Sequence, residues 1–286
     1  MPDPVKTILI LSVSSDIGLF LAKKYLSSGH RVIGTYRSAQ AVKAVAGHPN
    51  CHLFACDIHE PRNLSEFVEH VKGLGSHWDT FISCVGYPLP LQPFFDSDFD
   101  QWQKSVEVNS LDQLRAVHML YPLRNAQGAA DVVFFAGGGT NNAVVNLSAY
   151  TIGKIMLVKM CEFLDAEAPD LNIFIVGPGW TKTKTHQMIL NDPHVSRAKF
   201  EETEKFMQGK EGTSLEDIFQ CIQWLCAQGR SIAGGRNFSV VHDPWRSPQR
   251  EQLVEQLKVD SGMYKLRRHN NDFMQPKEAS CPSNLS

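Results

Sequence analysis

The chain has 286 residues, of which 43% are apolar and 20% charged, and its formal net charge is -2. This composition is that of an ordinary globular protein with a sizeable core, and the charge gives no attraction to nucleic acid or acidic membranes. No apolar run approaches the roughly 20 residues that cross a bilayer, and the first residues lack the layout of a secretory signal. Seven scattered cysteines are typical of reduced thiols. We therefore expect a single-domain cytoplasmic protein with no nucleic-acid or membrane partner.

The first forty residues predict a strand, a turn, a helix and a second strand. Thr7 to Leu11 is an apolar run typical of a strand buried on both faces. A small polar turn, residues 12–18, leads into a helix-like stretch from Leu19 to Ser27. Arg31 to Tyr36 then reads as the second strand. This is the layout of a dinucleotide-binding βαβ unit.

Strands and helices continue to alternate along the chain. The pattern predicts further strands at His52–Cys56, Thr80–Cys84, Asp131–Phe135, Asn172–Val176 and near Arg236–Val241. It predicts helices at about Asn63–Lys72, Phe99–Leu120, Tyr150–Ala166 and Ser214–Ala227, with a polar, mobile segment from Lys182 to Gly212. Alternation of this kind requires crossover connections between parallel strands. We expect an α/β fold, a Rossmann-like doubly wound parallel sheet with helices on both faces.

The composition shifts after His242. We therefore predict a dinucleotide-binding and catalytic domain over residues 1–243 and a C-terminal extension over residues 244–286. The extension is expected to hold a polar helix within Ser247–Val259, a basic stretch from Met263 to Arg268 and a disordered polar end. The basic stretch could dock on a neighbouring subunit, cover the site or simply be solvated. Cys51, His52 and Cys56 lie close together but lack a second cluster with zinc spacing, so no metal site is expected.

Tyr150 and Lys154 are the residues with the clearest chemical meaning. Four residues apart on a helix, they lie on one face. A phenol has an unperturbed pKa near 10, and an adjacent cation favours the phenolate and lowers that pKa toward neutral pH. The pair is thus a candidate device for proton transfer.

The βαβ start, Asn109, the Tyr150/Lys154 pair and Pro178-Gly179 occur in an order and spacing that resembles the short-chain dehydrogenase/reductase family. The resemblance covers about residues 5–243. It implies that Tyr150 is the catalytic acid/base, that Lys154 lowers its pKa and holds the nicotinamide ribose, and that Asn109 holds a water of a proton relay.

The resemblance also places the phosphate turn at residues 12–18, where only Gly18 of the family's usual three glycines remains. Ser12 and Asp16 occupy the other two places. The hydroxyls and the N–H groups at the helix start could still hold a pyrophosphate. The Asp16 carboxylate would repel phosphate unless it points away and caps the helix. The turn residues implied in cofactor binding are Ser12, Ser14, Ser15, Asp16, Ile17 and Gly18.

Arg37 follows the second strand, where members that prefer NAD carry an acidic residue. An arginine can pair with a 2′-phosphate, so NADP is the expected cofactor, with NAD possible. Thr181 is implied near the nicotinamide carboxamide and Thr183 near the phosphates. The other residues implied in cofactor binding are Ser38, Asp57, Ile58, Val85, Gly86, Tyr150, Lys154, Pro178 and Gly179.

The family's catalytic serine is missing. It usually stands about twelve to fourteen residues before the tyrosine, but positions 136–138 are Ala-Gly-Gly. Backbone N–H groups of the glycine turn could offer the lost hydrogen bond. Thr140 or Ser148 could also supply it, and Thr140, which we include among the catalytic residues, is nearer the usual place. Losing one such donor commonly lowers a rate by about 10² to 10³.

The resemblance therefore implies an NADP-dependent oxidoreductase that transfers hydride between nicotinamide and a carbonyl or secondary alcohol of a small polar substrate. One alternative is a catalytically weak dinucleotide-binding protein that acts as a sensor or assembly subunit. Another is a lyase or epimerase that uses the nicotinamide transiently. The family usually pairs through the two long helices, which predicts a homodimer or homotetramer.

Overall fold

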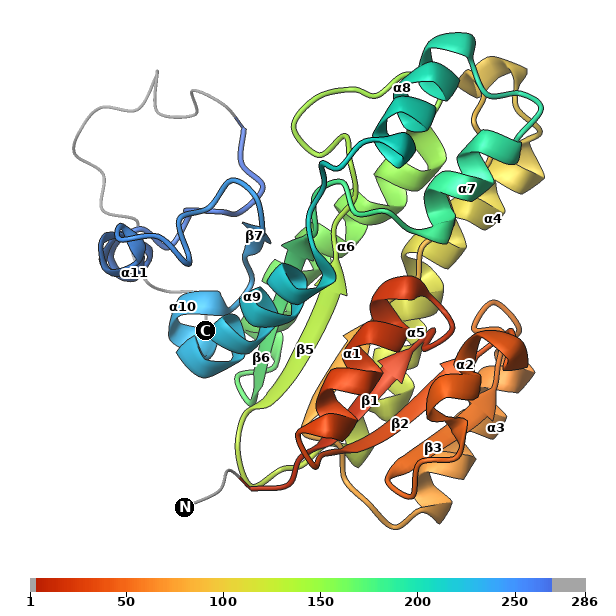
Figure 1. Cartoon of the computed structure of the whole chain (residues 1–286). Coiled ribbons are helices and arrows are strands. Elements are labelled where there is room, and N and C mark those ends of the chain that lie inside the picture. The colour runs from red at the N-terminus through yellow and green to blue at the C-terminus, as the bar shows by residue number, and fades with distance from the viewer. Residues whose placement is uncertain (1–3, 269–286) are drawn as a thin grey trace.

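A seven-stranded parallel sheet forms the centre of the computed structural model, which describes residues 4–268 (Figure 1). The spatial order of the strands is β3-β2-β1-β4-β5-β6-β7. Their bounds are β1 (Thr7–Leu11), β2 (Arg31–Tyr36), β3 (Cys51–Ala55), β4 (Thr80–Ser83), β5 (Ala130–Phe135), β6 (Leu171–Gly177) and β7 (Asn237–Ser239). The order reverses in the middle of the sheet, where β1 pairs with β2 on one side and with β4 on the other. Ligands of such folds bind beyond the carboxyl ends of the strands at this reversal.

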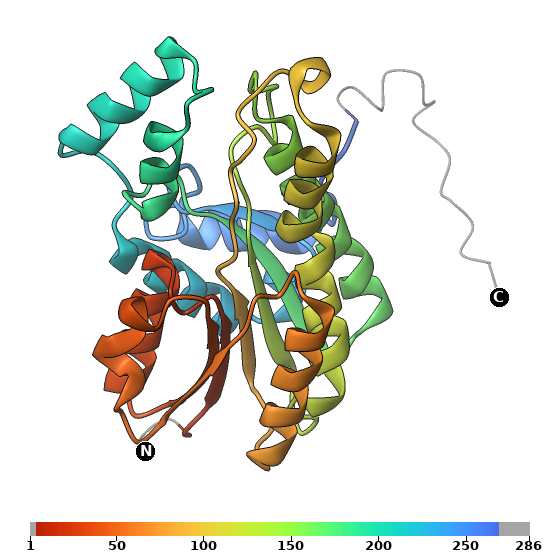
Figure 2. The same ribbon diagram turned by 90° about the vertical axis from the view of Figure 1, so that its right-hand side faces the viewer.

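Helices cover both faces of the sheet, as Figure 2 shows. The α-helices are α1 (Asp16–Ser27), α2 (Ala39–Ala46), α3 (Pro61–Gly73), α4 (Phe99–Asn109), α5 (Leu111–Leu120), α6 (Ser148–Glu167), α7 (Lys184–Asn191), α8 (Arg197–Gln208), α9 (Leu215–Gln228), α10 (Arg230–Ala233) and α11 (Arg250–Val259). Two short 3-10 turns, η1 (Phe94–Asp96) and η2 (Tyr121–Leu123), complete the fold.

Alternate residues of the strands feed two separate cores. Ile8 and Ile10 of β1 pack in a cluster with α1, α2, α9 and α11, whereas Leu9 and Leu11 pack in a cluster with α3, α5 and α6. Side chains of a strand point alternately to the two faces, so a strand covered on both sides is apolar throughout. The predicted doubly wound α/β fold is confirmed.

The helix predicted from Phe99 to Leu120 is interrupted. α4 ends at Asn109, α5 begins at Leu111, and Ser110 between them has φ -144° and ψ -77°, far from helical values. The prediction of one continuous helix was therefore wrong. The break lies next to Asn109, whose side chain is held by another segment.

The segment from 182 to 212 is not the loop that its polar sequence predicted. It contains α7 and α8, which stand beyond the carboxyl ends of the strands (Figure 1). Aromatic rings form a small core for this pair of helices: the centroids of Trp180 and Phe206 lie 4.9 Å apart, and those of His186 and Phe206 lie 5.0 Å apart. Apolar contacts from distant positions thus stabilise a segment that is polar on average.

The C-terminal extension packs on its own chain. The Asn237 N–H donates to the carbonyl oxygen of Tyr264 at 2.8 Å, and Arg267 pairs with Glu162 of α6 at 2.7 Å. The buried guanidinium of Arg236 donates to backbone carbonyls of α11 and to Met263. The basic stretch therefore packs in part on its own chain, while its last residues, 266–268, are exposed.

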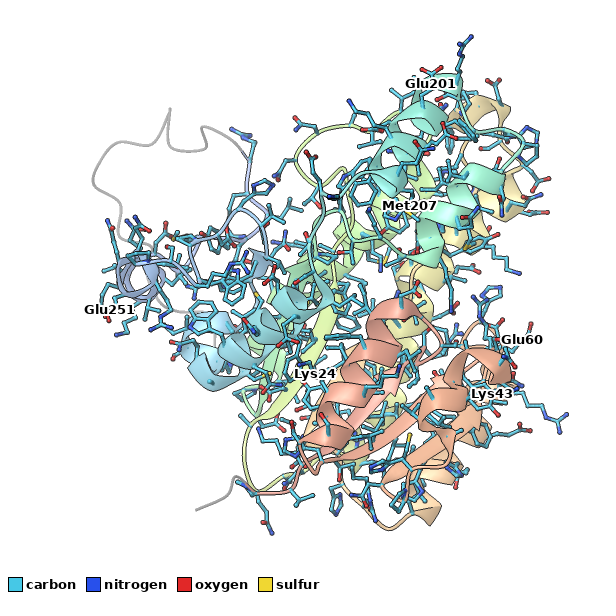
Figure 3. All side chains as sticks on the ribbon, in the orientation of Figure 1. Lys24, Lys43, Glu60, Glu201, Met207 and Glu251 are labelled. Atoms are coloured by element: carbon cyan, nitrogen blue, oxygen red, sulfur yellow. The ribbon has the colours of Figure 1, made fainter. Side chains whose placement is uncertain are left out.

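The helix of the extension and α8 lie in different parts of the molecule. In Figure 3, Glu251 marks α11 on one side of the molecule, while Glu201 and Met207 mark α8 at the end beyond the strands. The predicted polar end from residue 269 on lies outside the described residues. Within residues 4–268, no helix combines the length and apolarity needed to cross a membrane.

Candidate functional site

The turn after β1 has the geometry of a phosphate cradle despite its missing glycines. Ser12 adopts φ +63°, a left-handed conformation that glycine usually supplies. The Ser15 hydroxyl donates to the Ser12 carbonyl at 2.8 Å and accepts from the Gly18 N–H at 3.0 Å, so Ser15 caps α1. A β-carbon at Gly18 would collide with the Ser12 carbonyl oxygen. The turn therefore keeps its close approach of backbone to helix start, the arrangement that binds phosphate groups.

Asp16 is the first residue of α1, but its carboxylate caps α7. Its Oδ2 accepts the N–H of Lys184, the first residue of α7, at 2.6 Å. The Lys184 Nζ donates to the Ser14 carbonyl at 3.2 Å and lies 4.0 Å from Asp16 Oδ1. A carboxylate is favourable at a helix N-terminus. The acidic residue of the phosphate turn thus ties this turn to α7.

Several predicted cofactor residues lie near one another at the ends of β2 and β3. The Arg37 guanidinium lies 3.7 Å from the Asp57 carboxylate, and the Arg37 N–H donates to the Ser14 hydroxyl at 3.4 Å. Ser38 precedes α2, and Ile58 is buried. The Arg37 side chain is 64% exposed, so it can turn toward a ligand from this position.

The residues after β6 lie close to α7. Gly179 has φ +71°, and a β-carbon there would lie 2.5 Å from the Thr213 hydroxyl. Thr183 stands at the N-cap of α7. Thr181 is only 5% exposed, and its hydroxyl has no hydrogen-bond partner among the residues that the structure describes. Because a buried hydroxyl normally has a partner, Thr181 is suited to receive one from a ligand.

Lys154 is almost completely buried, at 2% exposure. Its ammonium donates to the Val85 carbonyl at 2.9 Å, directly after β4. Burial lowers the pKa of Lys154 to about 7, while the nearby Cys84 thiol acts weakly in the opposite direction. Its Nζ lies 5.9 Å from the centroid of the Tyr150 ring. The two residues predicted as a pair therefore lie side by side.

Tyr150 packs against the glycine that replaces the family's serine. A β-carbon at Gly137 would collide with the Cε1 atom of Tyr150 and lie 2.7 Å from its hydroxyl oxygen. The ring thus occupies the space of the missing side chain. Burial raises the pKa of Tyr150 to about 12. The predicted lowering of this pKa is therefore wrong, because desolvation dominates and the ammonium points at Val85 instead.

The hydroxyls near the glycine turn are directed at its backbone. Thr140 donates to the Gly137 carbonyl at 3.2 Å, and Thr151 donates to the Gly138 carbonyl at 3.2 Å. Ser148 accepts a hydrogen bond from the Trp102 indole N–H at 2.9 Å. Thr140 is the predicted replacement for the serine, but its only hydroxyl proton is used in the hydrogen bond to the Gly137 carbonyl. Thr151 was not singled out from the sequence, because its contact depends on the folded turn.

Asn109 is fully buried, and its amide holds the loop after β4. Its Oδ1 accepts the Tyr87 N–H at 3.0 Å, while its Nδ2 donates to the carbonyls of Tyr87 at 2.7 Å and Ser105 at 2.8 Å. A β-carbon at Gly153 of α6 would lie 2.7 Å from the Asn109 β-carbon, so α4 and α6 meet closely here. The side chain thus links the loop to α4, and Tyr87 and Gly153 are neighbours that the sequence did not reveal.

Comparison with known proteins places these features in a family. The sequence profile described as short chain dehydrogenase matches residues 6–193. The "Uncharacterized oxidoreductase YvrD" of Bacillus subtilis is 23% identical over 80% of this chain and 92% of its own length. A "Probable NADP-dependent dehydrogenase" of Haemophilus influenzae is 21% identical over 79% of this chain and 89% of its own.

Solved structures show the same fold. A short chain dehydrogenase/reductase of Saccharomyces cerevisiae superposes with a TM-score of 0.74 at 22% identity, covering 84% of this chain and 97% of its own. The RhlG/NADP active-site complex of Pseudomonas aeruginosa superposes with a TM-score of 0.68 at 18% identity, covering 82% and 94%.

Gly137→Ser would restore the family's hydroxyl, but we expect it to destabilise the protein. The new β-carbon collides with the Tyr150 ring, and such overpacking lowers the free energy of unfolding by about 1–3 kcal/mol. Gly138→Ser is the matched control, because a β-carbon there meets nothing within 4 Å. Urea unfolding of both variants measures the difference. Equal stability of the two, with Tyr150 unmoved in a crystal structure, would contradict the packing described above.

Lys154→Met is expected to remove a pH dependence of stability. The unfolded chain has the ordinary lysine pKa of 10.5, so above about pH 7 it binds one proton more than the folded protein. The free energy of unfolding therefore rises with pH in this window. From about pH 7 to about pH 9, the unmodified protein should gain roughly 2 kcal/mol relative to Lys154→Met.

Urea unfolding at the two pH values measures this gain, with the exposed Lys23→Met as a control that should behave like the unmodified protein. Parallel behaviour of Lys154→Met and the unmodified chain would show that the Lys154 ammonium is not held at a lowered pKa.

Proposed function

This chain belongs to the short chain dehydrogenase family of NAD(P)-dependent oxidoreductases, and we propose that it reduces the carbonyl group of a small polar molecule with NADPH. The observation that carries the proposal is the placement of Tyr150 and Lys154. A phenol and a buried ammonium lie side by side where β4 and β5 end, at the edge of the sheet where such folds bind ligands.

The chain's own residues fit a dinucleotide. Gly18 leaves no room for a side chain against the Ser12 carbonyl, so the backbone can approach a pyrophosphate closely. The unpartnered, buried hydroxyl of Thr181 suits the nicotinamide carboxamide. Lys154 would hold the nicotinamide ribose. When bound, the cofactor supplies the hydride that reaches the carbonyl carbon.

Tyr150 is the proton donor in the proposed direction. With its pKa raised to about 12, Tyr150 carries its proton at neutral pH and would give it to the carbonyl oxygen as the new C–H bond forms. The resulting phenolate lies beside Lys154, whose pKa of about 7 makes it a ready source of a replacement proton. We propose that the Asn109 amide also fixes the loop that carries Val85 and Tyr87.

The choice of NADP rests on the residues after β2. Arg37 stands there with the Ser14 hydroxyl close to its N–H, and both can bind a 2′-phosphate. No acidic residue stands at 36–38 to repel that phosphate. A relative named as NADP-dependent and a similar structure solved with NADP support the same choice.

A dinucleotide-binding sensor without turnover is the second candidate. The Asp16 carboxylate occupies the N-terminus of α7, and Gly137 offers no hydroxyl to the substrate. These departures favour binding over catalysis. NADPH binding without reduction of any carbonyl would support the sensor.

We further propose that the protein pairs with a second copy through α4, α5 and α6. Four large apolar side chains on these helices are substantially exposed: Phe99 at 58%, Leu111 at 44%, Ile152 at 45% and Phe163 at 50%. Exposed apolar surface of this kind is typical of an interface.

Tyr150→Phe tests the proposed function. Removal of the proton donor should lower kcat by about 10² to 10⁴ while leaving NADPH affinity within about twofold. NADPH oxidation is followed with diacetyl, glyceraldehyde, 4-nitrobenzaldehyde and phenanthrenequinone. Tyr121→Phe is the matched control, since Tyr121 contacts Asp170 just before the start of β6, at the opposite end of the strands from the site. Undiminished turnover by Tyr150→Phe would refute the assignment of Tyr150.

Arg37→Ala tests the choice of cofactor. Loss of the guanidinium should weaken NADPH binding by about 10- to 100-fold and change NADH binding little, because only NADPH carries the 2′-phosphate. Fluorescence titration with each cofactor measures this shift, with the exposed Arg62→Ala as control. Similar losses for both cofactors would argue against a 2′-phosphate contact.

A further inference from the structure

We propose that the N–H of Gly138 is the second hydrogen-bond donor to the substrate oxygen, beside the Tyr150 hydroxyl, and that Thr140 is the positioning residue that orients it. The inference rests on the proposed carbonyl reduction. In this chain the Gly138 N–H would make the hydrogen bond to the substrate oxygen that the serine hydroxyl makes in the family.

The orientation of the Gly138 N–H follows from the Thr140 contact. A peptide unit is planar and trans, so the carbonyl of Gly137 and the N–H of Gly138 point in opposite directions. The Thr140 hydroxyl holds that carbonyl at 3.2 Å. The carbonyl of Gly138 is held in the same way by Thr151. Two successive peptide units of the turn are therefore fixed by their oxygens, which leaves their N–H groups directed away from both threonines.

The Gly138 N–H has no hydrogen-bond acceptor within residues 4–268. By contrast, the Ala136 N–H just before it still donates to Val176 in β6 at 2.9 Å. The turn thus leaves the sheet at Gly137, and its next amide is available to a ligand. Gly138 is exposed, and a β-carbon there would meet nothing within 4 Å, so open space adjoins this amide.

The distance between the two donors suits one shared acceptor. The β-carbon position of Gly137 lies 2.7 Å from the Tyr150 hydroxyl oxygen. Covalent geometry puts the Gly138 nitrogen within about 3.7 Å of that position, so the two donors are at most about 6.4 Å apart. An oxygen between them can lie about 2.7–3.1 Å from each, the distance expected for stabilising a developing oxyanion.

The two nearby hydroxyls are less suited to this role. The Thr140 proton is used on Gly137. The Ser148 hydroxyl lies two residues before Tyr150 in the first turn of α6, where Trp102 holds it through its indole N–H. The backbone amide needs no side-chain reorganisation, and such preorganised donors contribute most to transition-state stabilisation.

Gly138→Pro and Gly138→Ala form the decisive pair of variants. Proline removes the N–H, whereas alanine keeps it, and the β-carbon that both residues add meets nothing within 4 Å. With the carbonyl that the unmodified protein reduces fastest among diacetyl, glyceraldehyde, 4-nitrobenzaldehyde and phenanthrenequinone, Gly138→Pro should lower kcat by about 10² to 10³. Gly138→Ala should stay within a few-fold. Both should bind NADPH like the unmodified protein, as measured by fluorescence titration.

Thr140 is tested through its coupling to Gly138. Thr140→Val should lower kcat about tenfold and leave NADPH affinity unchanged, while Thr140→Ser, which keeps the hydroxyl, should restore the rate. Added to Gly138→Pro, Thr140→Val should cause no further loss, because the group it orients is already gone. Independent, additive losses would overturn the positioning role.

Three further results decide the inference. Equal rates for Gly138→Pro and Gly138→Ala would overturn it while the proposed function stands. A larger loss in Ser148→Ala than in Gly138→Pro would overturn it in favour of the serine hydroxyl. Absence of turnover by the unmodified protein with every carbonyl would overturn the proposed function, and this inference with it.

Discussion

The contact between the Tyr150 ring and Gly137 is the constraint from which the rest of the site follows. Glycine at 137 leaves a space at the end of β5, and the phenol fills it. The same contact explains why no serine stands there, since its β-carbon would displace the ring. It also brings the hydroxyl next to the backbone of the glycine turn. Glycine at 137 thus has two effects. It removes the side-chain donor, and it lets the phenol lie close to a backbone donor.

A buried network supports this phenol from the other side. Lys154 holds the Val85 carbonyl, and Asn109 holds both polar backbone groups of Tyr87, two residues further on. Both side chains are almost completely buried, so their hydrogen bonds are not replaced by water. The loop after β4 is therefore fixed at two points, and the ammonium is held beside the Tyr150 ring. Loss of either side chain would leave these partly buried backbone groups without their protein partners.

Much of the fold could be predicted from the sequence, because its signals are local. Apolar runs flanked by small polar turns located the strands, and the spacing of Tyr150 and Lys154 on a helix indicated the site. Features that involve distant contacts could not be predicted: the break after Asn109 lies beside its hydrogen bond to Tyr87, and α7 and α8 pack around aromatic rings that include Trp180. The pKa of Tyr150 was predicted in the wrong direction, because burial and the direction of the ammonium appear only in the folded chain.

The central claim is that Tyr150 and the glycine turn together face the reacting carbonyl. A crystal structure with NADPH and an unreactive carbonyl analogue tests it most directly. We predict the analogue's oxygen at about 3 Å from both the Tyr150 hydroxyl and the Gly138 nitrogen, with the carbonyl carbon about 3–3.5 Å from C4 of the nicotinamide. A Tyr150 hydroxyl that points into the core, or lies more than about 6 Å from the analogue's oxygen, would contradict the claim.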